Sequence, residues 1–257
     1  FLMAGFKATI QSEFRYFLSS LYANILELFF TICLFLCSGL VALLIYPKQR
    51  ANYNNFIERY PYTGETINST QVGIFIILIP CLIILSVAIA FPRKSDLFLA
   101  YLSFIETLAV TLLITEVLKV TVARPRPNYF SYCGYDASTQ QCHGPDKYKR
   151  DAKLSFPSGH SSNSFSSATW IVLWLTHFFP QTQIWWILLK LIPIGLAAYV
   201  AATRITDYMH HVSDVVAGTL IGICVGTFIF MSQQSRIFLP SDHQDDEIPL
   251  NPSESIE

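Results

Sequence analysis

The chain has 257 residues, of which 52% are hydrophobic and 14% charged, and its formal net charge is −1. Because the apolar residues come in long blocks rather than at a helical or strand period, this composition is typical of an integral membrane protein and excludes an ordinary water-soluble domain. The charges are unevenly placed, and the sequence contains no internal repeat and no nucleic-acid motif, so we expect no nucleic-acid partner.

Six stretches are long enough to cross a bilayer, whose core of roughly 30 Å needs about 20 mostly apolar residues. Because lipid offers the backbone no hydrogen-bond partners, we expect each stretch to be an α-helix. The predicted spans are approximately residues 24–46, 72–91, 97–118, 161–179, 184–203 and 212–231. The predicted fold is therefore all-α, a bundle of six transmembrane helices.

The chain divides into three predicted parts. Residues 1–23 form an N-terminal interfacial segment, and residues 24–232 form the transmembrane domain. Residues 233–257 are acidic, contain serine and proline and have few large apolar side chains, so we expect a disordered tail. The first apolar block is long enough to span the membrane, so we expect a retained helix rather than a cleaved signal peptide.

Three polar clusters border the later spans. The first contains Lys119 and Arg126, the second is Pro157-Ser158-Gly159-His160, and the third runs from Arg204 through His210 and His211 to Asp214. With six helices, the loops after spans one, three and five lie on the same side of the membrane. All three clusters are therefore expected to meet at the helix ends on one membrane face.

The residue types in these clusters indicate phosphate chemistry. A phosphate monoester is a dianion, and Lys119, Arg126 and Arg204 can supply positive charge to its oxygens. Ser158 and Gly159 lie where a loop becomes a helix, and free backbone N–H groups at a helix start bind anions. The alternative for each cation alone is contact with lipid headgroups, and we interpret Arg124 in that way.

His210 and Asp214 are four residues apart, so they share a helix face if the sixth helix begins before His210. Asp214 would then hold one imidazole nitrogen and direct the other at phosphorus. His211 competes for this role, because it is three residues from Asp214. A zinc site of His160, His210 and Asp214 is the other alternative, but the nearby cations would repel a divalent ion, so we expect no metal and no cofactor.

Two acidic residues lie in the third predicted span, Glu106 and Glu116. Carboxylates are costly in lipid, so we expect both to face the bundle interior or a partner. Glu116 precedes Lys119 by one helical turn, and we expect it to orient that lysine.

Written as Lys-x6-Arg-Pro, Pro-Ser-Gly-His and Arg-x5-His-x3-Asp, the clusters resemble the three signatures of the type 2 phosphatidic acid phosphatase family, the lipid phosphate phosphatases. The third signature usually begins Ser-Arg, whereas here it begins Thr203-Arg204. The resemblance selects His210 over His211 as the nucleophile that forms a phosphohistidine. It also implies that His160 first protonates the leaving lipid oxygen and then activates water, without a metal.

Several substrates fit this resemblance. Phe156, the run 207–211 and the loop with Cys133 and Cys142 look most like the diacylglycerol-pyrophosphate-phosphatase-like branch, which accepts phosphatidic acid, its lyso form and diacylglycerol pyrophosphate. Related enzymes hydrolyse polyprenyl diphosphates, sphingoid phosphates or glucose 6-phosphate, and soluble relatives bind vanadate for halide oxidation. A non-catalytic lipid-binding scaffold is a further alternative, although every catalytic position is filled here.

Three features bear on which way the catalytic face points. The sequon Asn68-Ser69-Thr70 lies on that face, and glycosylation of Asn68 would place it in the lumen or outside the cell. Cys133 and Cys142 lie in the loop between the third and fourth spans and are either disulfide-bonded or free thiols. The catalytic-side loops are richer in basic residues, which the positive-inside rule would place in the cytosol, but several of these residues have a catalytic explanation. We expect a lumenal or extracellular site and cytosolic termini.

Overall fold

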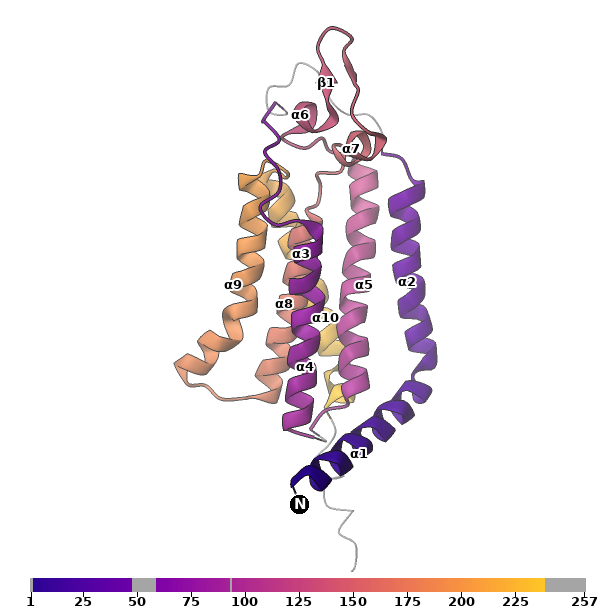
Figure 1. Ribbon diagram of the computed structural model, residues 1–257, viewed down its shortest axis with the longest axis vertical. Helices are drawn as coiled ribbons and strands as arrows, with labels where there is room; N and C mark the ends of the chain where they lie inside the picture. The colour runs from indigo at the N-terminus through magenta and orange to yellow at the C-terminus, as the bar shows by residue number, and fades with distance from the viewer. Residues whose placement is uncertain (1, 48–58, 93, 239–257) are drawn as a thin grey trace, which may run out of the picture.

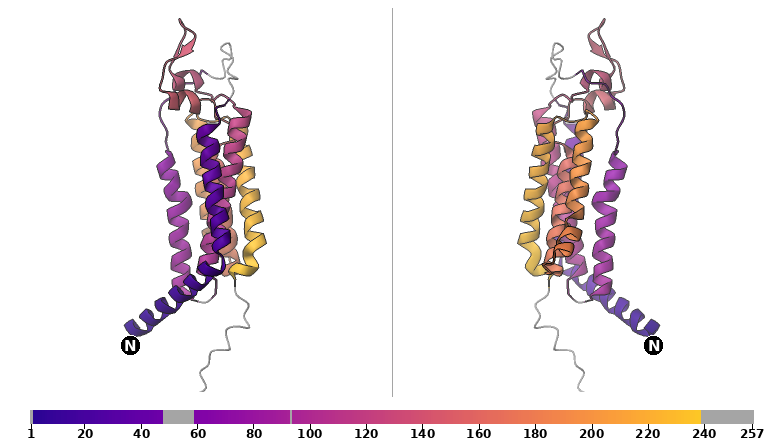
Figure 2. Two further views of the ribbon diagram at one scale, coloured as in Figure 1. Left: turned by 90° about the vertical axis from the view of Figure 1, so that its right-hand side faces the viewer. Right: turned by 90° about the vertical axis from the view of Figure 1, so that its left-hand side faces the viewer.

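The computed structural model describes residues 2–47, 59–92 and 94–238. Six long helical segments run side by side as a bundle, and α1 (Leu2–Ala23) leaves one end of it at an angle (Figure 1; Figure 2). The bundle segments are α2 (Ile25–Leu44), α3 (Ser69–Gly73) continued by η2 (Ile74–Leu78) and α4 (Ile79–Ala90), α5 (Leu97–Val122), α8 (Gly159–Phe178), α9 (Ile184–Thr206) and α10 (Val212–Ile237). The predicted all-α bundle is confirmed.

Five of the six segments are long and apolar enough to cross a membrane: α2, the segment from α3 to α4, α5, α9 and α10. Large apolar side chains such as Leu26, Leu188 and Phe228 are exposed on their outer faces, as expected of surfaces in contact with lipid. The protein is therefore a multi-pass membrane protein. The stretch 161–179 is helical as α8, but its polar first turns keep it outside this set.

The polar side of α8 is packed against α10 rather than exposed to lipid. A Cβ atom added at Gly218 would lie 2.5 Å from the carbonyl oxygen of Ser158, and one at Gly226 would lie 2.8 Å from that of Ser166. Small residues on both helices therefore let the two backbones approach closely. This packing brings the start of α10 against the start of α8, where the backbone N–H of Ser158 donates to the carbonyl of Asp214 at 3.0 Å.

The second bundle segment contains a widened π-helical turn, η2, which ends two residues before Pro80. Proline has no N–H group, so the carbonyl four residues earlier, that of Ile76, loses its usual helical partner. The hydroxyl of Ser167 on α8 donates to this carbonyl at 2.9 Å. The local irregularity thus ties the second segment to α8.

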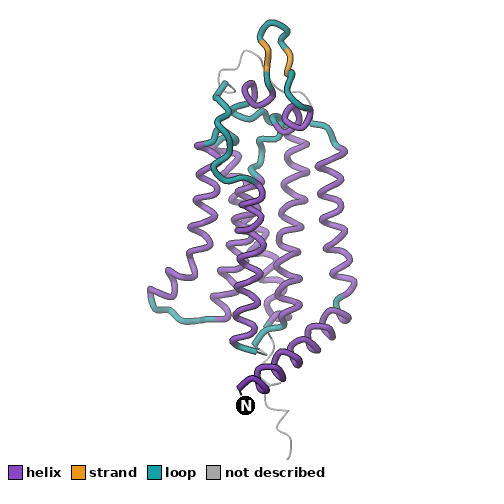
Figure 3. The backbone as a smooth tube through the Cα atoms, viewed as in Figure 1, coloured by secondary structure: helices purple, strands orange, loops and turns teal. Residues whose placement is uncertain are grey.

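A layer of short elements covers one end of the bundle, at the top of Figure 1 and among the loops of Figure 3. It consists of α6 (Tyr129–Cys133), the antiparallel strands β1 (Tyr135–Asp136) and β2 (Gln141–Cys142), and α7 (Asp146–Asp151). A disulfide joins Cys133 to Cys142 and holds the hairpin against α6. We call these elements the cap layer.

Residues 59–68, which we call the strap, lead across the same end of the bundle into α3. The backbone N–H of Tyr62 donates to the hydroxyl of Ser131 in α6 at 2.9 Å. The ring of Tyr60 stacks on Tyr208, with ring centroids 4.4 Å apart. Thr66 donates to Asp207 through both its backbone N–H (2.8 Å) and its hydroxyl (2.6 Å). The strap is therefore attached both to the cap layer and to the turn after α9.

At the opposite end, α10 continues past Gln233 to Ile237. Ile237 is fully buried, and Arg236 forms two hydrogen bonds of 2.7 Å with Glu27 on α2. Residues 233–237 are therefore helical and not part of a disordered tail, because they pack against the bundle. Phe238 is the C-cap of this helix, and the remaining residues of the predicted tail, 239–257, lie outside the described residues.

Candidate active site

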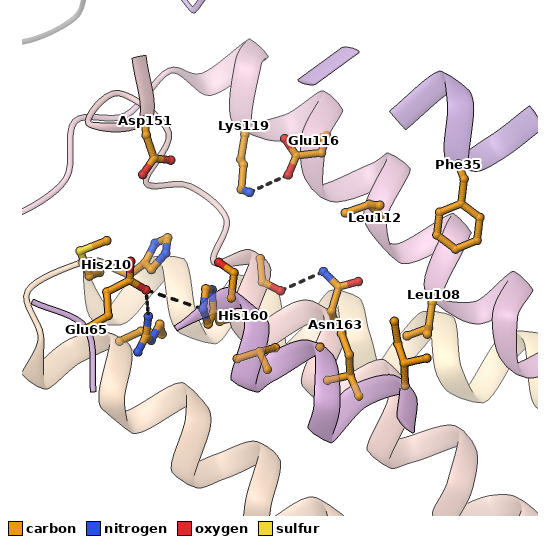
Figure 4. A pocket seen from close by; sticks show the side chains of 18 of the residues that line it. Phe35, Glu65, Leu108, Leu112, Glu116, Lys119, Asp151, His160, Asn163 and His210 are labelled. Atoms are coloured by element: carbon orange, nitrogen blue, oxygen red, sulfur yellow. Dashed lines mark hydrogen bonds and ion pairs between the residues drawn. The ribbon is translucent and has the colours of Figure 1, made fainter. Parts of the chain in front are cut away.

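A cavity of about 400 Å³ lies below the cap layer, between the second segment, α5, α8 and α9. One end of it is polar and includes His160 and His210, whereas the other end is lined by Phe35, Leu108 and Leu112 (Figure 4). Six of the residues singled out from the three signatures line this cavity, namely Lys119, Arg126, Gly159, His160, Arg204 and His210. Segments far apart in the sequence therefore converge on one polar site.

His210 lies in the turn between α9 and α10, and its side chain is only 3% exposed. Its Nδ1 atom is 2.6 Å from the backbone carbonyl oxygen of Ser155. A carbonyl can only accept, so Nδ1 carries the proton and Nε2 keeps its lone pair. Burial, together with the charge of Arg126, lowers the pKa of His210 well below its usual range. The imidazole is therefore neutral at pH 7 and nucleophilic through Nε2.

The predicted pairing of Asp214 with His210 is corrected by this geometry. The Asp214 carboxylate is 4.0 Å from His210 Nδ1, because α10 begins at Val212 and His210 precedes it. Asp214 instead accepts from the hydroxyl of Ser155 at 2.5 Å. It therefore acts on His210 only indirectly, by fixing the residue whose carbonyl holds the imidazole.

Arg124 is also placed differently from its interpretation as a headgroup contact. Its Nη1 atom donates to Asp214 at 2.6 Å and to the hydroxyl of Ser213 at 2.7 Å. Asp214 is fully buried, and a buried carboxylate without a cation would be costly. Arg124 therefore stabilises the start of α10.

His211 does not enter the cavity. It caps the start of α10, where its backbone N–H donates to Asp214 at 3.0 Å, and its Nε2 atom is 3.2 Å from the carbonyl of Pro125. Both ends of this residue are thus engaged in local structure. The geometry distinguishes the two neighbouring histidines and favours His210 as the reactive one.

Lys119 reaches the cavity from the last turn of α5. Its Nζ atom donates to Glu116 at 2.6 Å, which is the contact predicted from their spacing. A Cβ atom at Gly159 would lie 3.0 Å from this Nζ atom, so glycine leaves the space that the lysine uses. Gly159 therefore admits a cation to the start of α8.

Arg126 is 6% exposed and is held on three sides. Its Nε and Nη2 atoms donate to the backbone carbonyl and the carboxylate of Asp151, each at 2.9 Å, and its Nη1 atom donates to the carbonyl of Met209 at 3.1 Å. The same Nη1 atom is 3.4 Å from His210 Nε2. A fixed guanidinium thus lies beside the nitrogen that carries the free lone pair.

Arg204 is fully buried in the last turn of α9. Its Nε and Nη2 atoms donate to the hydroxyl of Thr203 at 3.3 and 3.1 Å, and Nη2 also donates to Asp207 at 3.0 Å. Thr203 therefore performs an orienting role that needs only a hydroxyl, which accounts for threonine where the signature usually has serine. The remaining Nη1 atom points to Glu65 of the strap, 2.8 Å away.

His160 lies in the first turn of α8 and lines the cavity. Within the described part of the chain, its buried Nε2 atom has no hydrogen-bond partner. The nearest acid is Glu65, whose Oε2 atom is 3.9 Å away (Figure 4). This nitrogen is therefore available to a ligand in the cavity.

Ser158 is not placed as the phosphate-binding prediction requires. Its side chain is fully buried and caps α8 by accepting from the backbone N–H and the hydroxyl of Ser161, at 3.4 and 3.0 Å. It does not line the cavity. The position of Ser158 is explained by its capping role.

No group of three or more His, Cys, Asp and Glu side chains is arranged to hold a metal ion within the described residues. The zinc alternative required His160, His210 and Asp214 to converge, but Asp214 faces Arg124 and Ser155. The site is built instead from cations paired with carboxylates.

Three site residues were not identified from the sequence, namely Glu65, Asp151 and Ser155, and Arg124 was interpreted as a headgroup contact. The usable signal was charge compensation, because buried arginines require acidic partners. The loops around the signatures contain few acids, so pairing Arg126 and Arg204 with loop carboxylates would have given a short set of candidates that includes Asp151 and Glu65. The role of Ser155 is carried by its backbone carbonyl, which no side-chain pattern reveals.

Asn68 caps the start of α3. Its side chain accepts from the backbone N–H of Gln71 at 3.0 Å, and the Gln71 side chain accepts from the backbone N–H of Asn68 at 2.9 Å. Asn68 is exposed on the same end of the bundle as the cap layer. Its glycosylation remains a prediction.

Comparison with known proteins gives a consistent result. Residues 100–238 match the PAP2 superfamily. The chain is 30% identical to Lipid phosphate phosphatase 1 of Arabidopsis thaliana over 199 residues, which cover 73% of this chain and 59% of that protein. It is 28% identical to Diacylglycerol pyrophosphate phosphatase 1 of Saccharomyces cerevisiae over 229 residues, which cover 80% and 76% of the two chains. No solved structure matches at a significant level.

The chain thus spans less than two thirds of the length of the Arabidopsis relative. The matched segment, residues 100–238, nevertheless takes up more than half of this chain and contains all three signatures. The cavity that these signatures line has the cations and imidazoles of a phosphate site. The chain belongs to the PAP2 superfamily.

Proposed function

We propose that the protein is an integral membrane phosphatase that hydrolyses phosphatidic acid and related phospholipid monoesters or pyrophosphates without a metal. The observation that carries this proposal is the two-ended cavity (Figure 4). Cations and imidazoles at one end suit a phosphate, and apolar side chains at the other suit an acyl chain. The names of the relatives, a lipid phosphate phosphatase and a diacylglycerol pyrophosphate phosphatase, support the same substrate class.

In the first chemical step, Lys119, Arg126 and Arg204 bind the phosphate oxygens and offset the charge that develops on them. The Nε2 atom of His210 attacks phosphorus. The bond from phosphorus to the lipid oxygen breaks, and His160, which becomes protonated when the phosphate dianion is bound beside it, gives its proton to the leaving alkoxide. The products of this step are the free lipid alcohol and a phosphohistidine.

In the second step, water attacks the phosphorus of the phosphohistidine. His160, now neutral, takes a proton from this water, and the bond from phosphorus to His210 breaks. Inorganic phosphate leaves, His210 regains its lone pair and His160 regains its proton. Ser155 holds the imidazole through both steps, since its carbonyl accepts from Nδ1.

We also propose that the site faces the lumen or the cell exterior, with the termini in the cytosol. Two features support this orientation. The disulfide between Cys133 and Cys142 lies in the cap layer, and disulfides persist in oxidising compartments. The sequon at Asn68 lies exposed at the same end of the bundle.

The test compares two phosphate monoesters that differ in the presence of acyl chains. Phosphate release from phosphatidic acid in detergent micelles and from glycerol 3-phosphate is measured with excess chelator. We expect release from phosphatidic acid to persist in chelator and to exceed that from glycerol 3-phosphate by at least about 100-fold in kcat/KM, since only the lipid gains binding energy from the apolar end. Equal rates, or complete loss in chelator, would refute the proposal.

A variant separates the contributions of the two ends of the cavity. Leu112→Trp narrows the apolar end without changing a charged group. We expect it to raise KM for phosphatidic acid and to leave the slow hydrolysis of glycerol 3-phosphate unchanged. Polyprenyl diphosphates and sphingoid phosphates tested in parallel rank the alternative lipid substrates.

A further inference from the structure

Each cation in the cavity is already paired with a carboxylate. The pairs are Lys119 with Glu116, Arg126 with Asp151, and Arg204 with both Glu65 and Asp207. Three cations therefore face four acids when no substrate is present. An arriving phosphate dianion therefore meets little net positive charge, and the departure of one carboxylate would strengthen its binding.

Two of these four carboxylates, Asp207 and Asp151, are fixed by further hydrogen bonds. Asp207 accepts two hydrogen bonds from Thr66 in addition to the one from Arg204. Asp151 accepts from the hydroxyl of Tyr132 at 3.1 Å as well as from Arg126. Glu116 accepts from Lys119 at 2.6 Å, and the helix α5 holds its backbone in place.

Glu65 differs from the other three acids. It lies on the strap rather than on a helix, and in the part of the chain that the structure describes its carboxylate has one hydrogen bond, from Nη1 of Arg204. Arg204 does not depend on this contact for its position, because Thr203 and Asp207 hold its other two nitrogens. Glu65 can therefore leave while the guanidinium stays in place.

The carboxylate of Glu65 lies where an oxygen atom of a bound ligand would lie. Its Oε2 atom is 2.8 Å from Nη1 of Arg204 and 3.9 Å from the unpartnered Nε2 of His160. An oxygen of a substrate phosphate bound between this guanidinium and this imidazole would need the same place. A carboxylate and a phosphate oxygen accept from a guanidinium with the same geometry.

We propose that the Glu65 carboxylate occupies the place of a substrate phosphate oxygen at Arg204 and must leave it before a phosphorylated lipid binds. Glu65 is then the residue that sets the affinity of the site for phosphate. This inference rests on the proposed function, since it concerns the same phosphate site. The strap holds Glu65 at this place, because Thr66, the next residue of the chain, donates two hydrogen bonds to Asp207.

A purely structural role for Glu65 makes the opposite prediction. If Glu65 orients Arg204 for the substrate, its loss weakens phosphate binding. If it competes with the substrate, its loss strengthens phosphate binding. The sign of the change therefore distinguishes the two roles.

The test uses Glu65→Gln in the full chain, solubilised in detergent, and inorganic phosphate as the probe in isothermal titration calorimetry. The amide keeps the shape of the side chain but removes its charge, so an ion pair with Arg204 becomes a weaker hydrogen bond between the guanidinium and a neutral amide. We expect phosphate to bind about tenfold more tightly, because Arg204 holds the side chain that phosphate displaces less strongly. KM for phosphatidic acid is expected to fall in the same direction, without a matching rise in kcat.

Glu27→Gln is the matched control, since it removes the same charge at the opposite end of the bundle, where Glu27 pairs with Arg236. It is expected to leave phosphate affinity unchanged. Glu65→Asp is the second variant, and it tests whether Glu65 competes with phosphate if Glu65→Gln does not fold. It keeps the charge but shortens the reach to Arg204, so phosphate binding is expected to tighten by a smaller factor.

Unchanged or weaker phosphate binding in the folded Glu65 variants would overturn the inference. The binding measurement needs no turnover, so it also separates two kinds of failure. A wild-type protein that binds phosphate but releases none from any lipid would refute the proposed function, and the effect of the Glu65 variants on phosphate affinity would still be decided.

Discussion

The substitution Asp214→Asn tests how the reactive imidazole is held. Asp214 is fully buried and accepts from Arg124, from the hydroxyl of Ser155 and from the backbone N–H of His211. Asparagine preserves the shape of the side chain but removes its charge and turns one acceptor into a donor. The imidazole of His210 keeps its own partner, because that partner is the Ser155 carbonyl at 2.6 Å and not Asp214 at 4.0 Å.

The structure sets the size of the expected effect. In a triad whose carboxylate itself holds the imidazole tautomer, the same substitution lowers kcat about 10⁴-fold. Here the tautomer survives, and the loss comes from weaker anchoring of Ser155, worth roughly one or two hydrogen bonds to a charged group. We therefore expect kcat to fall between about tenfold and 100-fold. The protein should also be destabilised by about 2 kcal/mol, since Arg124 loses its anionic partner.

The assay is phosphate release from phosphatidic acid at saturating substrate, with thermal unfolding of the same preparations. Ser155→Ala is the matched variant, because it removes the hydroxyl that contacts Asp214 but keeps the carbonyl that contacts His210. Its kcat is expected to fall no more than that of Asp214→Asn. A 10⁴-fold loss in a folded Asp214→Asn protein would refute this reasoning and restore Asp214 as the direct partner of His210.

Three further predictions follow from single contacts. Glu116→Gln removes the anionic partner of Lys119 and should lower kcat/KM about tenfold; unchanged activity would show that Lys119 needs no orienting. Gly159→Ala places a Cβ atom 3.0 Å from Lys119 Nζ and should displace this cation from the cavity. KM in phosphate-release assays should therefore rise several-fold while Tm changes little, and an unchanged KM would contradict the close approach. Because burial and Arg126 lower the pKa of His210, the unfolded chain takes up a proton there more readily, and stability should fall as pH drops below about 6.5. His210→Gln should show a smaller fall in Tm between about pH 7 and pH 5, and an equal fall would refute the assignment.

The bundle and the meeting of the signatures were predictable because both follow from strong local signals. Apolar blocks of spanning length determine the helices, and an even number of spans places the three clusters at one end. The stretch now seen as α8 was predicted as a span from its length. Its burial against α10 explains how serine-rich turns occur within a membrane bundle, since Gly218 and Gly226 let the helices approach.

The details of the site were less predictable because they depend on where helices begin and on backbone atoms. A start of α10 before His210 would have paired His210 with Asp214, but the helix starts at Val212. The partner of His210 is a carbonyl, which every residue possesses. Glu65 comes from a loop more than 130 residues from Arg204 in sequence, a pairing that only the fold brings about.

The central claim is that His210 becomes phosphorylated during turnover. In the most direct measurement, the protein is mixed with phosphatidic acid radiolabelled on phosphorus in excess chelator. The reaction is stopped rapidly, and the label that remains on the chain is counted. Wild-type protein is predicted to carry label that is stable in alkali and lost in acid, as expected of phosphohistidine, and His210→Ala is predicted to carry none. Label on folded His210→Ala, or wild-type turnover with no labelled protein at any quench time, would contradict the account.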